Sequence, residues 1–138
     1  MRRIIKNISN DNGSIYVEFL VGILLLMIVL ALAVSILSVF SIKNKLDNAN
    51  ELLMQQAEMT GSTDLSVEIA NLKTKTGLDF TVSFDGTEYM PGSSSKVQLG
   101  EEIHITLSFV QNIGAGDLVR VPITVKSSFM RLSQHYHK

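Results

Sequence analysis

The sequence predicts an α+β protein, with one long N-terminal helix, a short helix and an antiparallel sheet of three to four strands. Two observations predict this fold class. No charged residue occurs from Phe19 to Ile42, and neither glycine nor proline interrupts the chain between Ile23 and Thr60. After residue 77, apolar and polar residues alternate in several short segments, which is the period of half-buried strands.

The apolar run is long enough to cross a membrane. A bilayer core about 30 Å thick needs roughly 20 apolar residues in a helix, so we expect a transmembrane helix over residues 14–42. A signal peptide is a poorer interpretation, because its apolar region covers only about 7–15 residues and ends at a small-residue cleavage site. No A-x-A sequence follows this run.

The positive charges that flank the run predict its orientation. Arg2, Arg3 and Lys6 precede it, whereas Lys43 and Lys45 follow it. The positive-inside rule therefore favours a cytoplasmic N-terminus. We expect a single-pass membrane protein with a cytoplasmic leader at 1–13 and an extracytoplasmic C-terminal domain.

The helix is expected to continue beyond the membrane over residues 43–60. Its apolar residues there recur on one face, which is typical of a helix that packs on one side. This apolar stripe contains Leu46, Ala49, Leu53, Met54 and Ala57. Gly61 is the predicted end of the helix.

Residues 61–138 are predicted to form a small α+β domain. Its first element is a short amphipathic helix that Thr63 or Asp64 caps and Gly77 ends. The apolar face of this helix consists of Leu65, Ile69 and Leu72.

Three strands are predicted over 78–84, 101–109 and 118–126. Residues 87–90 are a candidate return strand after a turn at Asp85–Gly86, and 91–95 form a loop. Pro122 cannot donate a ladder hydrogen bond, which places the last strand at an edge or a bulge. We expect the stripe of the long helix to cover the apolar face, composed of Leu78, Phe80, Val82, Phe84, Ile103, Ile105, Leu107, Phe109, Val119, Val121, Ile123 and Val125.

Composition excludes several classes of function. The chain has 138 residues, a formal net charge of −1 and no cysteine. It therefore offers no basic face for nucleic acid, no disulfide and no thiolate site. Because no G-x-S-x-G, P-loop, H-E-x-x-H or dinucleotide motif is present, we expect no enzyme activity, no cofactor and no small-molecule substrate.

The remaining polar candidates favour structural interpretations. His104 is expected to be exposed on the polar side of a strand, and His135 and His137 have no third metal ligand nearby in sequence. Glu101 and Glu102 are adjacent, so on a strand they would point to opposite faces and could not share a substrate. Small residues in the apolar run either permit close helix contacts or reflect composition alone: Gly22, Ala31, Ala33, Ser35 and Ser38.

Glu18 is the exception in the N-terminal segment. An ionisable group costs roughly 2.5–3.5 kcal/mol at the centre of a membrane helix and less near its end. Glu18 is therefore either an interfacial residue without a role or a residue with a specific partner.

The surroundings of Glu18 resemble the type IV prepilin signal, in which a basic leader, a glycine, four residues and a glutamate precede an apolar helix. In that family, prepilin peptidase cuts after the glycine, which implies a cleavage site at Gly13–Ser14. The stretch "GSIYVEF" (13–19) is similar to the TadE/TadG-like pseudopilins of tight-adherence pili. The pair Glu18–Phe19 and a large C-terminal domain are typical of minor pseudopilins.

The C-terminal part is similar to the DUF4320 family. The matching stretches are "VQLGEEIHI" (97–105), "VPITVK" (121–126) and "LSQHYHK" (132–138).

Together, the resemblances imply a structural subunit of a Tad-type pilus or secretion apparatus in the bacterial cell membrane. Its partners would be prepilin peptidase, other pilin subunits and an assembly platform. Glu18 would pair with the new amine on Ser14 of a neighbouring subunit. The alternative is an unprocessed, signal-anchored protein whose outer domain binds a partner or ligand.

Overall fold

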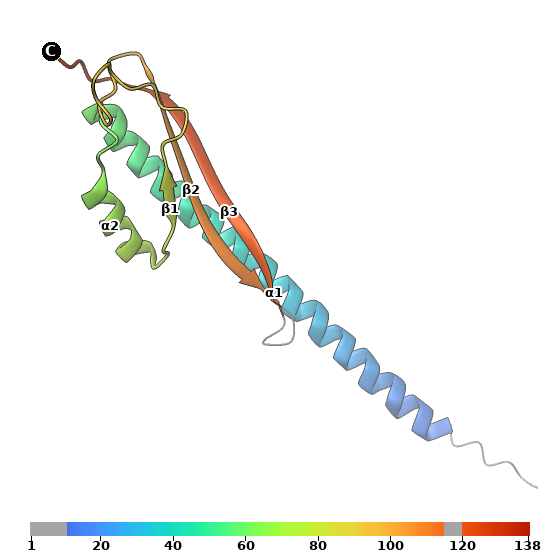
Figure 1. Ribbon diagram of the computed structural model, residues 1–138. Helices are drawn as coiled ribbons and strands as arrows, with labels where there is room; N and C mark the ends of the chain where they lie inside the picture. The colour runs from blue at the N-terminus through green and yellow to red at the C-terminus, as the bar shows by residue number, and fades with distance from the viewer. Residues whose placement is uncertain (1–10, 115–119) are drawn as a thin grey trace, which may run out of the picture.

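A long helix with a sheet along its C-terminal part forms the molecule (Figure 1). The computed structural model describes the backbone of residues 11–114 and 120–138, and side chains from residue 15 onward. The elements are α1 (Asp11–Thr60), α2 (Ser66–Thr76), β1 (Thr81–Ser83), β2 (Glu102–Ile113) and β3 (Val121–Leu132). The predicted α+β class is confirmed.

Helix α1 contains 50 residues. It begins three residues before the predicted start at residue 14, so the end of the predicted leader belongs to it, and residues 1–10 lie outside the described residues. The helix ends at Thr60, as predicted. Gly61 follows with φ of +59°, and its N–H donates to the Ala57 carbonyl at 2.8 Å, which is the left-handed stop that glycine favours.

Helix α2 starts later than predicted. Its cap is Leu65, without a side-chain cap, so the prediction of Thr63 or Asp64 is wrong. The reason is tertiary: the Thr63 N–H donates to the Ser95 carbonyl at 2.8 Å, which ties this segment to a neighbouring loop. At the other end Gly77 is left-handed, with φ of +68°, and ends the helix as predicted.

The sheet is antiparallel in the order β1-β2-β3. Strand β3 is therefore an edge strand, and it contains Pro122 opposite Asn112, in agreement with the prediction for this proline. Both long strands extend beyond the predicted ends, to Ile113 and Leu132. Residues 118 and 119, where the last strand was expected to begin, lie outside the described residues.

The segment before β2 contributes less to the sheet than predicted. Only Thr81–Ser83 form a strand, and residues 87–90 form none. The Thr87 hydroxyl accepts from the His104 N–H at 3.0 Å and donates to the His104 carbonyl at 3.1 Å. The Thr87 side chain thus engages both main-chain groups of His104, and the Glu88 N–H donates to the Glu102 carbonyl at 3.0 Å, but residues 87–90 form no strand.

The predicted stripe on α1 covers the sheet. All of its residues are buried, and they pack against buried β2 residues: Leu46, Ala49, Leu53, Met54 and Ala57 on the helix, Ile103, Ile105 and Leu107 on the strand. On β3, Val125 is buried, whereas Val121 and Ile123 are 51% and 39% exposed. Burial of those two was wrongly predicted, because a single helix does not cover the far end of an edge strand.

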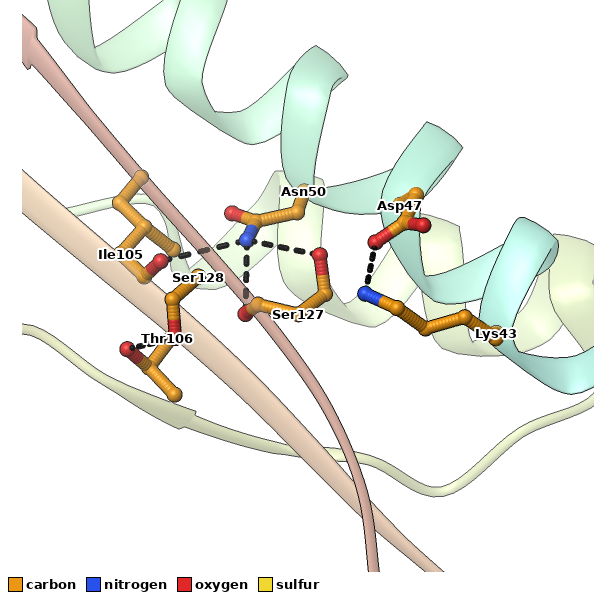
Figure 2. Close-up of polar contacts among 7 residues, drawn as sticks. All are labelled: Lys43, Asp47, Asn50, Ile105, Thr106, Ser127 and Ser128. Carbon is orange, nitrogen blue, oxygen red and sulfur yellow. Dashed lines mark hydrogen bonds and ion pairs between the residues drawn. The ribbon is translucent and has the colours of Figure 1, made fainter.

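A buried amide fixes the helix to the sheet (Figure 2). The Asn50 Nδ2 donates to the carbonyl oxygens of Ile105 at 3.2 Å and of Ser127 at 2.9 Å. Asn50 and Ser127 are 0% and 1% exposed. Because these bonds reach both β2 and β3, they set the height of the sheet along α1.

Candidate assembly site on the N-terminal helix

Residues 15–30 of α1 carry no protein cover within the described chain. Every residue from Ile15 to Leu30, here called the bare segment, is exposed within the described chain. The helix is long and apolar enough to cross a membrane, with a mean hydropathy of 3.2 in its most apolar window. A helix that is apolar all round requires either lipid or other helices around it.

Glu18 and Phe19 lie on this bare segment, and both are exposed. Within the residues that the structure describes, no hydrogen bond or ion pair reaches Glu18. Removing such a carboxylate from water without a partner carries a desolvation penalty of several kcal/mol. The arrangement therefore leaves Glu18 to be satisfied by water at an interface or by another molecule.

Gly13 and Ser14 lie in the first turn of α1, after its start at Asp11. Ser14 and Glu18 are four residues apart along α1, which is about one helical turn. Their axial separation is about 6 Å at 1.5 Å per residue. The structure thus places the predicted cleavage position and the predicted assembly residue at the same end of α1.

The end of the apolar run is marked by an ion pair. Lys43 Nζ lies 2.6 Å from Asp47 Oδ1, an i, i+4 pair on α1 (Figure 2). Burial acts to raise the pKa of Asp47, but hydrogen bonds from Lys43 and Ser127 and the charge of Lys43 outweigh it. The pKa of Asp47 therefore lies below its ordinary value.

The small residues of the run do not share one environment. Ala31, Ser35 and Ser38 are partly buried, whereas Gly22 and Ala33 are exposed. The partial burial of Ala31, Ser35 and Ser38 therefore arises from other residues of the same chain, and it requires no second helix.

The histidines have structural contacts. His104 is partly buried and not exposed as predicted, with Nε2 at 3.1 Å from Glu102 Oε2. The rings of His135 and His137 touch, with centroids 4.5 Å apart, and His137 Nε2 lies 3.0 Å from the Gly61 carbonyl oxygen. No group of three or more metal-ligating side chains occurs among the described residues.

Glu101 interacts with Glu88 from the preceding segment. A hydrogen bond with Glu88, together with the negative charge of Glu88, raises the pKa of Glu101. The sequence drew attention to the neighbour Glu102 and missed this pair, because Glu88 is thirteen positions away.

The C-terminal segments meet at the end of α1. The Val97 N–H donates to the Gly61 carbonyl at 2.7 Å, and the Ser133 hydroxyl donates to the Val97 carbonyl at 3.2 Å. His137 contacts the same Gly61 carbonyl. Val97, Ser133 and His137 thus form a clamp around the glycine that ends the long helix.

The DUF4320 profile, described as a domain of unknown function, matches residues 23–138. The chain belongs to the DUF4320 family. No curated protein and no solved structure matches it. The matched region contains the covered part of α1, the sheet and the clamp, whereas Gly13, Ser14 and Glu18 precede it.

Asn50 was not among the residues that the sequence singled out. A signal for it exists: Asn50 lies between Leu46 and Leu53 at helical spacing, within an otherwise apolar stripe. A polar residue at such a position predicts a buried hydrogen-bond partner. The identity of that partner depends on strand register, which the helix sequence does not contain.

Proposed function

We propose that this chain is a membrane-anchored, minor pilin-like structural subunit of a Tad-type pilus or secretion apparatus. Prepilin peptidase would process it after Gly13 on the cytoplasmic side. The C-terminal part, here called the head and formed by residues 43–138, would face outward. The observation that carries the proposal is Glu18, an exposed carboxylate five positions after Gly13 on an otherwise apolar, bare helix. The role is structural, without catalysis.

Processing would provide the partner that Glu18 lacks within the described chain. Cleavage creates an α-amino group on Ser14, with an ordinary pKa of about 7.7–8.0. In an assembly of parallel helices, this amine from one subunit reaches the Glu18 carboxylate of the next. A matched cation removes much of the cost of burying the carboxylate, so the pair fixes the axial register between subunits.

The N-terminus of the mature chain tests processing. We expect mass spectrometry of the membrane-extracted protein, co-expressed with a prepilin peptidase, to show a chain that begins at Ser14. A Gly13→Leu variant should remain full length under the same conditions. An intact Met1 in the wild-type protein beside an active peptidase would refute processing.

Substitution of Glu18 tests the register pair separately. Glu18→Val should insert and be cleaved normally, because it makes the helix more apolar, but should no longer enter filaments or co-purify with neighbouring subunits. Glu18→Asp keeps the carboxylate and should restore part of the assembly. Normal assembly of Glu18→Val would exclude the register role, whatever the result for cleavage.

A groove in the structure favours a second candidate function, which is the binding of a partner by an unprocessed, signal-anchored protein. It lies between α1 and α2 and has a volume of about 290 Å³, with both apolar and charged lining residues: Leu52, Leu53, Gln55, Gln56, Glu68, Asn71, Leu72 and Lys75. A signal-anchored protein could bind a partner there without polymerising. An unprocessed N-terminus, together with loss of that partner on Leu52→Asp, would favour this function over the pilin-like one.

A further inference from the structure

The β2–β3 hairpin reaches down the apolar part of α1. We call residues 110–113 and 121–123 the hairpin end. The hydrogen bond from Asn50 to Ile105 fixes one level of β2 on α1. Ile113 is eight residues farther along β2, or about 26 Å at 3.3 Å per residue. The same distance along α1 is about 17 residues, so the hairpin end lies near the level of residue 33.

Burial along α1 supports this level independently. Residues 15–30 are all exposed, and Ala31 is the first residue that is partly covered. Ser35, Ser38 and Val39 follow on the same face, and Ile42 is buried. Figure 1 shows β2 and β3 converging on this part of α1.

The bare segment is too short to cross a bilayer by itself. Its sixteen residues span about 24 Å, whereas the hydrocarbon core is about 30 Å thick and needs roughly 20 residues. Extension toward the N-terminus would add polar residues, beginning with Ser14 and Gly13. Extension toward the C-terminus adds only apolar residues, Ala31 to Val34, and reaches the level of the hairpin end.

The position of Glu18 strengthens this conclusion. If Glu18 stays at the cytoplasmic boundary, a span of roughly 20 residues runs from Phe19 to about residue 38. Residue 33 is five residues, or about 7–8 Å, from residue 38, so the hairpin end reaches the outer boundary region of the bilayer. In either placement the outer boundary of the hydrocarbon lies at or beyond the level of the hairpin end, and on the N-terminal side of Lys43.

Five of the seven residues of the hairpin end are apolar, and the other two are Gln111 and Asn112. Val110 and Val121 are 58% and 51% exposed, and Ile123 is 39% exposed. Side chains alternate between the two faces of a strand. Val110 therefore lies on the face opposite to buried Leu107 and points away from α1, whereas Val121 and Ile123 lie on the same face as buried Val125. Apolar surface thus occurs on both faces of the hairpin end. Pro122 is exposed and removes one main-chain donor from the edge strand, which lowers the cost of contact with lipid.

We propose that the hairpin end inserts into the outer lipid interface of the bilayer that α1 crosses. The head then contacts the membrane at two places, α1 and the hairpin end, which fixes its height and rotation relative to the bilayer. The proposal requires only that α1 spans a membrane and does not depend on cleavage or on a pilus.

Site-specific fluorescence in nanodiscs tests the insertion. The chain contains no cysteine and no tryptophan, so Val121→Cys and Val110→Cys introduce unique sites for an environment-sensitive label in an otherwise silent protein. Met130→Cys is the matched control, because Met130 is 55% exposed and apolar but lies toward the other end of β3. Circular dichroism of each labelled variant checks that it is folded.

We expect doxyl-labelled lipids to quench the labels at residues 110 and 121 severalfold more than the label at 130. Iodide in the buffer should show the opposite order. One protein per nanodisc excludes contacts between copies, so lipid quenching there can come only from the bilayer. Equal lipid and iodide quenching at residues 121 and 130 would overturn the proposal. Shielding that appears only with several copies per vesicle, without lipid quenching, would also overturn it and indicate a subunit interface.

Discussion

Two segments of the same helix have opposite surroundings. From Ile15 to Leu30 every residue of α1 is exposed, whereas from Leu46 to Ala57 one face is buried at 0–2% exposure beneath the sheet. The helix itself is continuous, so local backbone preference does not separate the two. The difference lies in the pattern: the first segment is apolar all round, and the second is apolar on one stripe.

This difference assigns separate sources of stability to the two segments. The covered segment gains free energy from packing within its own chain. The bare segment can gain it only from lipid or from another chain. Substitutions in the covered segment should therefore change the unfolding of the head, and substitutions in the bare segment should change insertion or assembly.

The largest effect is expected for Leu53→Ala. Leu53 is fully buried, and removal of a core leucine side chain typically costs about 2–5 kcal/mol. The free energy of unfolding of the full-length chain in micelles, followed by circular dichroism during denaturant titration, measures this loss. Leu24→Ala on the bare segment is the control and should leave it unchanged. A similar loss for both variants would show that the two segments unfold as one unit.

Gly61→Ala should have the next largest effect. Alanine in the left-handed region costs about 1–2 kcal/mol, and a Cβ at residue 61 would lie 2.9 Å from the Val97 carbonyl oxygen and 2.8 Å from His135 Cβ. Gly77→Ala is the matched control, because its φ is +68° but a Cβ there meets nothing within 4 Å. Gly61→Ala should therefore lower the melting temperature clearly more than Gly77→Ala, and equal shifts would contradict the clamp.

Asn50→Ala tests the polar link between α1 and the hairpin. It removes the donor to Ile105 and Ser127, and loss of buried hydrogen bonds of this kind costs about 1–3 kcal/mol. Asn48→Ala, on the exposed side of the same helix, should change the free energy of unfolding by less than about 0.5 kcal/mol. Amide exchange of β3 should accelerate only in the Asn50 variant; unchanged exchange would contradict the link.

The sequence predicted the elements in which a local pattern and the tertiary structure agree. The α1 stripe around Leu46 and Leu53, the stop at Gly61 and the edge position of Pro122 each follow from nearby residues. The predictions were wrong where a contact with a residue far away in the sequence determines the local structure. Thr87 engages His104 and residues 87–90 form no fourth strand, and the tie between Thr63 and Ser95 delays α2.

The same contrast between local patterns and distant contacts applies to the candidate site. The sequence singled out Gly13, Ser14, Glu18 and Phe19 as a predicted site, and the structure adds that Glu18 and Phe19 are exposed on a bare helix. The proposed membrane contact of the hairpin end could not be predicted from sequence. It depends on the register that places Ile105 beside Asn50, because that register determines how far the hairpin descends along α1.

The smallest effect is expected from pH, at the boundary between the two segments. The pKa of Asp47 is lowered in the folded protein, so the Lys43 pair stabilises the fold above the unfolded pKa of about 3.9 and this contribution is lost as pH falls through the folded value. Because the Asp47 side chain is 35% exposed, the contribution should be below about 1 kcal/mol. Asp47→Asn should remove this part of the acid sensitivity in unfolding titrations between pH 3 and pH 7.

The raised pKa of Glu101 acts in the opposite direction. Its contribution to stability is present at low pH and is lost as pH rises, so Glu101→Gln should stabilise the head at neutral pH. Destabilisation by Glu101→Gln at neutral pH would contradict the repulsion from Glu88.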